Sequence, residues 1–191
     1  MKVTPVLPVA LLLTLLATSP LHAQTTERIT LYADKLGTDC SIADVGVRTV
    51  YVYMIHEGTG TRVLSEFRAP KPDCWTGAIW DSDELNGATI GGLAGYSQGS
   101  DLTAVYVGCL PLPVYIGRMV FEATGAAEPC CRYAVLPSVF EPSSVLTADC
   151  EFAQVPILGG SAVINENASC PCSPPLAFES TTWGRVKSLY H

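Results

Sequence analysis

The stretch Thr49-Val50-Tyr51-Val52-Tyr53-Met54-Ile55 decides the fold class of this 191-residue chain. It combines β-branched and aromatic side chains, which favour an extended backbone. It is also apolar on both faces, and strands of that kind lie inside a sheet with both faces covered. The pattern therefore predicts a central strand over residues 47–56.

Turn-forming residues divide the remaining chain into short segments of the same kind. Glycine, proline, asparagine and serine interrupt it about every 8–12 residues, a spacing typical of an antiparallel sandwich or barrel. Within 114–123, Arg118 and Glu122 fall on one face and Met119 and Phe121 on the other, as in a half-exposed strand. We predict an all-β fold, an antiparallel β-sandwich, with further strands over 28–33, 62–67, 75–80, 88–90, 102–108, 114–123, 132–136, 144–149 and 161–165.

The first residues have the pattern of an export signal. Lys2 precedes an apolar run over 6–17, and the small residue Ala23 follows a polar break. The run is too short to span a bilayer comfortably, and no later stretch is long and apolar enough to do so. We predict a signal peptide over 1–23 and an exported mature chain, extracellular or periplasmic.

The cysteines agree with an oxidising compartment. There are eight, all downstream of the predicted signal, and an even number in an exported chain predicts four disulfides. The adjacent pair Cys130 and Cys131 would point to opposite faces of a strand and so bridge to different partners. Cys170 and Cys172, which enclose Pro171, are likewise expected to bond elsewhere rather than to each other. The remaining connectivity stays open among Cys40, Cys74, Cys109, Cys130, Cys131, Cys150, Cys170 and Cys172. A redox pair at Cys170-Pro171-Cys172 is disfavoured, because such pairs usually enclose two residues at a helix start.

A change of composition follows the last cysteine. Pro174 and Pro175 predict an extended linker over 173–180. After it, Trp183, Val186 and Tyr190 fall on one side of a short amphipathic helix over 181–191. The sandwich domain is therefore expected over 24–172, and the helix is expected to dock on the sandwich or on a partner, since so short a helix is marginal alone.

The charge excludes some classes of partner. The formal net charge is −7, and the acidic residues are scattered singly rather than gathered. Nucleic acid and anionic membrane surfaces attract basic patches, so neither is expected as a partner.

One pentapeptide matches the nucleophile pattern of α/β-hydrolases. Gly95-Tyr96-Ser97-Gln98-Gly99 has the required glycines, but that chemistry needs a following helix, then an acid and a histidine. The residues after it have strand character, and the mature chain keeps only His56 and His191. A hydrolase using Ser97 remains an alternative that a histidine close to Ser97 would favour.

The run Asp81-Ser82-Asp83 begins like a calcium loop. The spacing then fails, because Leu85 occupies a ligand position. We predict a solvated acidic turn, with no metal site or cofactor, and leave an irregular calcium site at Asp81–Asp83 open.

Aromatic residues suggest a ligand-binding surface. Trp75 and Trp80 are five residues apart, so within one strand they would face opposite sides, one in the core and one exposed. An exposed tryptophan beside Tyr96 would stack on a sugar. Trp75, Trp80 and Tyr96 are therefore the candidate ligand-binding residues of a carbohydrate-binding alternative.

Four stretches carry a resemblance over most of the mature chain: residues 29–40, Phe67 to Cys74, Asn165 to Cys172, and the ending Thr182-Trp183-Gly184-Arg185-Val186-Lys187-Ser188-Leu189-Tyr190. Together they resemble uncharacterised secreted, cysteine-rich proteins of environmental bacteria that end in a Trp-Gly-x-x-Lys-x-Leu segment. The resemblance implies a bacterial secreted or surface protein and no catalytic residues. The expected function is a non-catalytic structural or recognition module, whose partner is a glycan or another surface protein.

Overall fold

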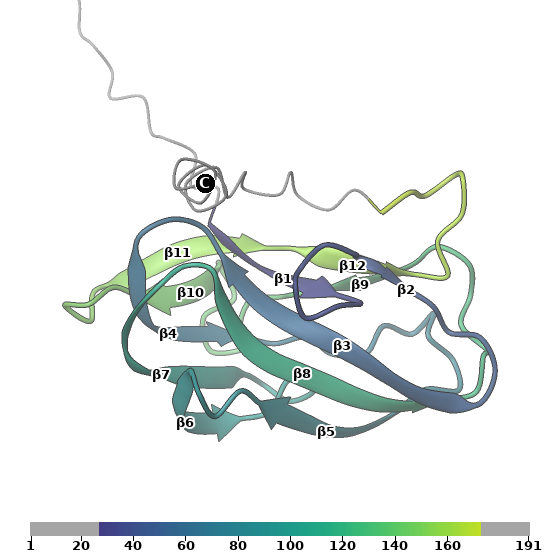
Figure 1. Cartoon of the computed structure of the whole chain (residues 1–191), viewed down its shortest axis with the longest axis horizontal. Helices are drawn as coiled ribbons and strands as arrows, with labels where there is room; N and C mark the ends of the chain where they lie inside the picture. The colour runs from purple at the N-terminus through teal and green to yellow at the C-terminus, as the bar shows by residue number, and fades with distance from the viewer. Residues whose placement is uncertain (1–26, 173–191) are drawn as a thin grey trace, which may run out of the picture.

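The structure is a computed structural model that describes residues 27–172, and its described part is built from strands and turns without a helix. Figure 1 shows the strands along the chain. They are β1 (Arg28–Tyr32), β2 (Ser41–Ile42), β3 (Arg48–Glu57), β4 (Thr61–Phe67), β5 (Ile79–Leu85), β6 (Ile90–Gly95), β7 (Leu102–Pro111), β8 (Val114–Ala123), β9 (Cys131–Ala134), β10 (Val145–Ala148), β11 (Gln154–Gly159) and β12 (Ser161–Ile164). The predicted all-β class is confirmed. The predicted signal peptide, linker and C-terminal helix lie outside the described residues, in which no helix is long and apolar enough to cross a membrane.

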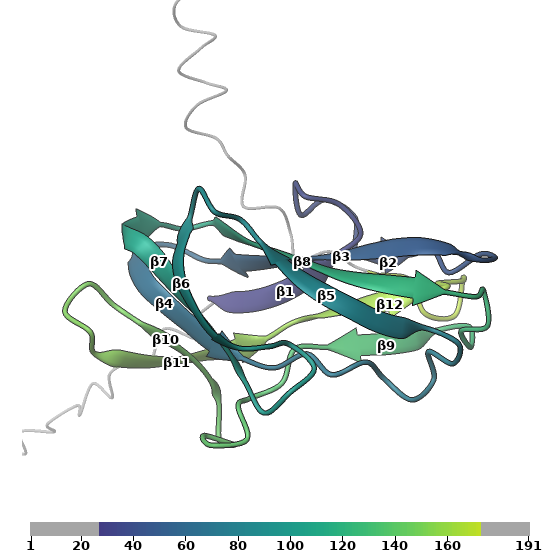
Figure 2. The ribbon, with the colours of Figure 1, turned by 90° about the horizontal axis from the view of Figure 1, so that it is seen from below.

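Nine strands form one sheet in the order β5-β8-β3-β1-β11-β10-β4-β7-β6, and β2-β12-β9 form a smaller one. The large sheet folds back on itself, because its two end strands, β5 and β6, are joined by the turn in which Thr89 N–H donates to the Asn86 carbonyl (2.9 Å). Two layers result, which Figure 2 shows from the side. The pairing is antiparallel as predicted, except that β1 pairs with β11 and β2 with β12 in parallel.

A single glycine separates β11 from β12 and lets one extended segment serve both sheets. β11 pairs with β1 and β10, whereas β12 pairs with β2 and β9. At Gly160 the backbone approaches Thr30 so closely that an added Cβ would lie 2.4 Å from the threonine hydroxyl oxygen. Only glycine fits there without displacing β1. β11 was not predicted, because Gly159 and Pro156 interrupt the pattern of a strand.

The predicted central strand is central over half of its length. β3 pairs with β8 along nearly all of its residues, but with β1 only from Tyr53 to Glu57. Val50, Val52 and Met54 point into the core, whereas Tyr51 lies on the outer face and is 39% exposed. Tyrosine tolerates that position because its ring is covered by the Arg118 guanidinium, 4.1 Å from the ring centroid.

An aromatic cluster fills the core between the layers. Trp75 is fully buried, and its ring centroid lies 4.5 Å from that of Phe121 on β8 and 5.9 Å from that of Tyr133 on β9. The Trp75 indole N–H donates to Asp44 Oδ2 at 3.1 Å, which satisfies the one polar atom of the ring.

Three local predictions are wrong. The strand predicted over 88–90 is not formed, because Ala88 and Thr89 belong to the turn and β6 begins at Ile90. The strand predicted over 75–80 does not form as such, because the chain turns at Cys74–Gly77, and only Ile79 and Trp80 are extended, at the start of β5. The acidic run Asp81–Asp83 is part of β5 rather than a solvated turn. Antiparallel pairing with β8 supplies the backbone hydrogen bonds that make this polar segment extended. The segment itself has no alternation of apolar residues from which a strand could be predicted.

Four disulfides connect all eight cysteines: Cys40–Cys172, Cys74–Cys131, Cys109–Cys150 and Cys130–Cys170. The adjacent residues Cys130 and Cys131 bond to different partners, as predicted. So do Cys170 and Cys172, which excludes a disulfide between these two.

A thiol titration tests the disulfide count. The denatured mature protein, purified without reductant, is expected to show no titratable thiol, because thiols of exported proteins oxidise and each cysteine has a partner at disulfide distance. The same titration after reduction is the control and is expected to show eight thiols. Two or more free thiols in the unreduced protein would contradict the pairing.

Candidate functional site

Trp80 and Tyr96 meet at the corner where β5 faces the end of β6. Their rings stack, with centroids 5.5 Å apart and an interplanar angle of 23°. Tyr96 follows β6 directly and is 51% exposed, whereas Trp80 is half-buried. The structure thus brings together two of the three predicted ligand-binding residues.

The third, Trp75, is a correction. Its side chain has no exposed surface, because it fills the core against Phe121 and Tyr133. A ligand at the surface has no access to it, so Trp75 is removed from the candidate site.

Asp83 holds the corner together from β5. Its carboxylate accepts the Trp80 indole N–H (3.2 Å) and both the backbone N–H and the hydroxyl of Ser97 (2.7 Å each). A residue three positions from Trp80 would normally lie on the opposite face of a strand. A register shift between Trp80 and Ser82 places Trp80 opposite Phe121 and Asp83 opposite Met119, so both point inward.

The loop between β6 and β7, residues 96–101, is firmly bonded. The Gln98 side-chain amide donates to the Ala69 carbonyl (2.7 Å) and to the Tyr133 hydroxyl (3.0 Å). Gly99 lies so close to the Tyr96 ring that an added Cβ would lie 3.0 Å from its Cζ. The loop therefore presents Tyr96 in a fixed position.

The same bonds remove Ser97 as a nucleophile. Its side chain is fully buried and donates to a carboxylate rather than to a base. His56, the histidine within the described residues, bonds to Glu27, Ser65 and Tyr106 instead. Among residues 27–172, no histidine bonds to Ser97, although the geometry of an α/β-hydrolase requires one, and His191 lies outside the described residues.

A second loop, residues 135–144 between β9 and β10, adjoins the first. Val139 N–H donates to the Ser100 carbonyl (2.9 Å), and Arg68 Nε–H donates to the Pro137 carbonyl (2.9 Å). Val139 is 55% and Phe140 75% exposed. Both loops project on the lower side of the view in Figure 2. We call Trp80, Tyr96, Val139 and Phe140 the end cluster.

Sequence reasoning missed the second loop. A weak signal was available, because Val139-Phe140 is an apolar pair enclosed by Pro137 and Pro142. Prolines mark a loop, and loops run over the surface, so an aromatic residue there is exposed. That the pair belongs with Tyr96 follows only from the tertiary contact between the loops.

A second constellation is a serine, a histidine and a carboxylate inside the sandwich. His56 on β3 lies 2.9 Å through Nε2 from Glu27 Oε1 and 2.9 Å through Nδ1 from Ser65 Oγ on β4. The Tyr106 hydroxyl lies 2.8 Å from the same Nδ1, and Arg62 Nε–H donates to the Glu27 carboxylate at 2.7 Å. His56 and Ser65 are fully buried and Glu27 is nearly so, so no substrate reaches this group.

The charges in this buried group are balanced. Burial lowers the pKa of His56 below its usual value, and the hydrogen bond to Glu27 offsets part of that effect. Burial raises the pKa of Glu27, but hydrogen bonds from His56 and Arg62 outweigh it and lower that pKa overall. A neutral His56 donates from Nε2 to an ionised Glu27 and accepts at Nδ1, so Arg62 provides the balancing charge. The arrangement satisfies its members and acts structurally.

Within residues 27–172, no three histidine, cysteine, aspartate or glutamate side chains gather as they would around a metal ion. Asp83 is occupied by Trp80 and Ser97, and Asp81 is the extra residue at the β5 register shift. These two carboxylates therefore do not converge into the irregular calcium site that the sequence left open.

No family model matches the sequence, and the search of curated proteins found no match. Among solved structures, the chain is similar to the sixth cohesin of Acetivibrio cellulolyticus scaffoldin B, solved in complex with a Cel5 dockerin mutant (13% identity, TM-score 0.49, 74% of this chain and 99% of that chain). It is also similar to the cohesin module of a Clostridium perfringens family 33 glycoside hydrolase (11%, 0.49, 75% and 100%) and to a non-cellulosomal cohesin from Archaeoglobus fulgidus (10%, 0.44, 72% and 90%). At such identities and TM-scores, the likeness assigns neither a family nor a partner to this chain.

Proposed function

We propose that this chain is an exported recognition module, without catalytic activity, that binds another protein through the end cluster. The observation that carries the proposal is a pair of loops, joined by the hydrogen bond from Val139 N–H to the Ser100 carbonyl, that expose Tyr96, Val139 and Phe140. The four disulfides support an oxidising compartment outside the cytoplasm.

The composition of the end cluster fits the centre of a protein interface. Interface cores are enriched in aromatic residues and depleted in lysine, glutamate and aspartate, and no member of the end cluster is charged. Ser100, Asp101 and Glu141 lie beside it in the two loops and provide a polar rim. Because hydrogen bonds already fix the loop between β6 and β7, binding costs little conformational entropy.

The same geometry disfavours the carbohydrate-binding alternative. A sugar stacks on a flat aromatic face that is open to solvent. Here the rings of Trp80 and Tyr96 stack, so each ring covers one face of the other, and Gly99 lies against the Tyr96 ring. The two rings do not form a platform side by side.

Substitution of Phe140 by alanine tests the proposal. The mature protein is used to capture exported proteins of the organism that makes it, by photo-crosslinking from position 140, and its affinity for the purified captured protein is then measured. Phe140→Ala is expected to weaken binding by about 30-fold or more, because truncation of an aromatic interface anchor typically costs about 2 kcal/mol or more.

Phe152 provides the matched control. It is 72% exposed, nearly as much as Phe140, but lies at the tip of the β10–β11 hairpin. Phe152→Ala is expected to leave the affinity unchanged. A glycan array and a pull-down on insoluble polysaccharides run in parallel. Retention on a glycan that Phe140→Ala does not weaken, or equal losses in both variants, would show that the end cluster is not the binding surface.

A further inference from the structure

A groove runs along the free half of β3. β1 pairs with β3 from Tyr53 to Glu57 and then leaves the sheet, since Ala33 N–H donates to the Asp39 carbonyl of its own loop (2.7 Å). Among residues 27–172, the part of β3 from Arg48 to Val52 pairs with β8 alone. Alternate residues of this half therefore direct their N–H and C=O groups away from β8, into the groove.

The opposite wall is the short strand β2. Cys40 and Ile42 use their carbonyls for β12, accepting from Val163 N–H and Asn165 N–H (2.9 Å each). In a parallel ladder the residue between them points the other way. The Ser41 carbonyl therefore faces β3 across the groove.

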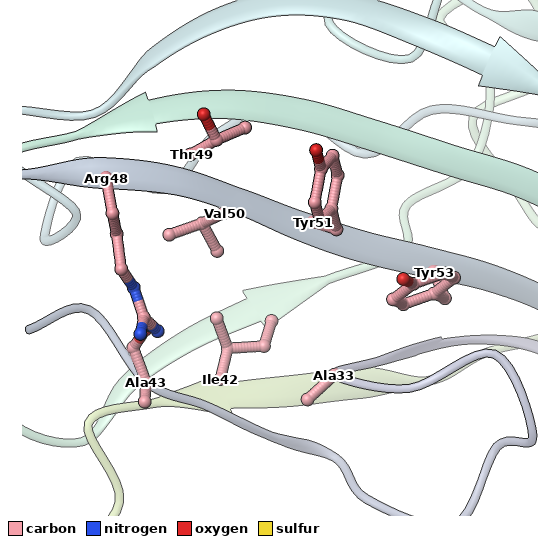
Figure 3. Close-up of a pocket in the computed structure, with 8 residues that line it drawn as sticks. All are labelled: Ala33, Ile42, Ala43, Arg48, Thr49, Val50, Tyr51 and Tyr53. Carbon is pink, nitrogen blue, oxygen red and sulfur yellow. The ribbon is translucent and has the colours of Figure 1, made fainter.

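The floor of the groove is apolar, because Val50 and Ile42 lie there (Figure 3). The volume of the groove is about 250 Å³, and the groove is lined by Ala33, Ile42, Ala43, Arg48, Thr49, Val50, Tyr51 and Tyr53. Figure 3 shows Val50 and Ile42 between the two walls and Arg48 reaching across one end. There the Arg48 guanidinium donates to the Ala43 carbonyl.

We infer that residues 176–179 of this same chain, Leu176-Ala177-Phe178-Glu179, add to β3 as a strand in this groove. The tether is the Cys40–Cys172 disulfide, which holds the two Cα atoms 5.8 Å apart. Cys40 lies two residues before Ile42, at the end of the groove near Ala33. Four residues span up to about 14 Å when extended, so Leu176 reaches the groove from Cys172.

The direction of entry gives the added strand a defined pairing. A segment that enters at Cys40 and runs toward Arg48 is antiparallel to β3 and parallel to β2. The added strand would take the place beside β3 that β1 occupies up to Tyr32, and it would run in the same direction, since β1 is also antiparallel to β3. Strand addition of this kind takes its affinity from main-chain hydrogen bonds along an open sheet edge.

Side chains and charge fit the same placement. Leu176 and Phe178 fall on one face of an extended segment and Ala177 on the other, so an apolar side chain meets the floor in either register. Glu179 then arrives at the end of the groove where Arg48 lies. This inference concerns a different surface from the end cluster and does not depend on the proposed function.

Amide hydrogen exchange in β3 tests the inference on the full mature protein. The groove-facing amides between Arg48 and Val52 are expected to exchange slowly in the unmodified chain. In Leu176→Asp/Phe178→Asp they are expected to exchange at least about tenfold faster, because the added strand no longer covers them. Val186→Asp/Leu189→Asp, which introduces the same charges farther along the tail, is the control and is expected to leave them unchanged.

A charge exchange makes the test specific. Arg48→Glu alone is expected to speed exchange of the same amides, and Arg48→Glu combined with Glu179→Arg to restore their protection. Protection must also persist on dilution, because the segment and the groove belong to one chain. Equal exchange in the unmodified protein and in Leu176→Asp/Phe178→Asp would overturn the inference. Loss of protection on dilution would also overturn it and assign the groove to a second copy.

Discussion

Trp75→Ala is expected to lower the free energy of unfolding by about 3–5 kcal/mol, the usual cost of removing a large aromatic side chain from a packed core. Trp75 lies at the centre of the sandwich, in contact with Phe121 and Tyr133 from opposite layers. Its loss opens a cavity between the layers and removes the indole N–H from Asp44. Thermal or denaturant unfolding of the mature protein, followed by near-UV circular dichroism, measures the effect.

Trp80→Ala is the matched control for the same experiment. Trp80 is half-buried at the corner, and its stacking on Tyr96 is worth about 0.5–1.5 kcal/mol beyond the area that it buries. We expect a clearly smaller loss of stability than for Trp75→Ala. If both variants lose the same stability, or if Trp75→Ala leaves it unchanged, the division into a core tryptophan and a surface tryptophan is wrong.

The second large effect concerns the buried group around His56. Glu27→Ala is expected to lower the free energy of unfolding by about 3–5 kcal/mol, because it leaves the partly buried Arg62 and the His56 Nε2–H without their acceptor. Glu27 lies immediately before β1, so its carboxylate also fixes the start of that strand against β3 and β4. The midpoint of chemical denaturation at neutral pH measures the loss.

The pH dependence of stability follows from the same group. The pKa values of His56 and Glu27 are both lower in the folded protein than their usual values of 6.5 and 4.5. Below those values the unfolded chain therefore binds more protons than the folded chain. The stabilisation is complete above pH 6.5 and decreases as the pH falls, first through His56 and then, below pH 4.5, through Glu27.

His56→Gln separates the two contributions. Glutamine does not titrate, so in this variant the decrease just below pH 6.5 is expected to disappear, whereas the decrease below pH 4.5 remains. Denaturation midpoints measured across this range provide the comparison. An unchanged slope just below pH 6.5 in His56→Gln would contradict a buried neutral histidine.

Strands could be predicted from the sequence wherever apolar and polar residues alternate within the segment itself. The strands around Val52, Val63 and Phe121 have that pattern and form as predicted. Where a strand is polar or contains glycine and proline, as in β5 and β11, pairing with a neighbour makes it extended, and prediction failed. The adjacent cysteines restricted the disulfide partners for a geometric reason, since neighbouring residues point to opposite sides.

The candidate site was predictable only in part. Tyr96 stood out as an aromatic residue between two glycines, but Val139 and Phe140 join it through a contact between loops about forty residues apart in sequence. The register shift in β5, which sets Trp80 and Asp83 on one face, depends on how β5 pairs with β8. The spacing of three residues would put them on opposite faces of an undisturbed strand.

Residue type and the alternation of neighbours along a strand were enough to predict the all-β class, the four disulfides and the assignment of Cys130 and Cys131 to separate partners. Three other features depend on the tertiary structure: which tryptophan is core and which is surface, the bond of Ser97 to Asp83 rather than to His56, and the pairing of β1 with half of β3 within residues 27–172. Each of these depends on which strands become neighbours and in which register. The neighbours and the register are set by the packing of the whole sandwich, which brings together residues that are far apart in the chain.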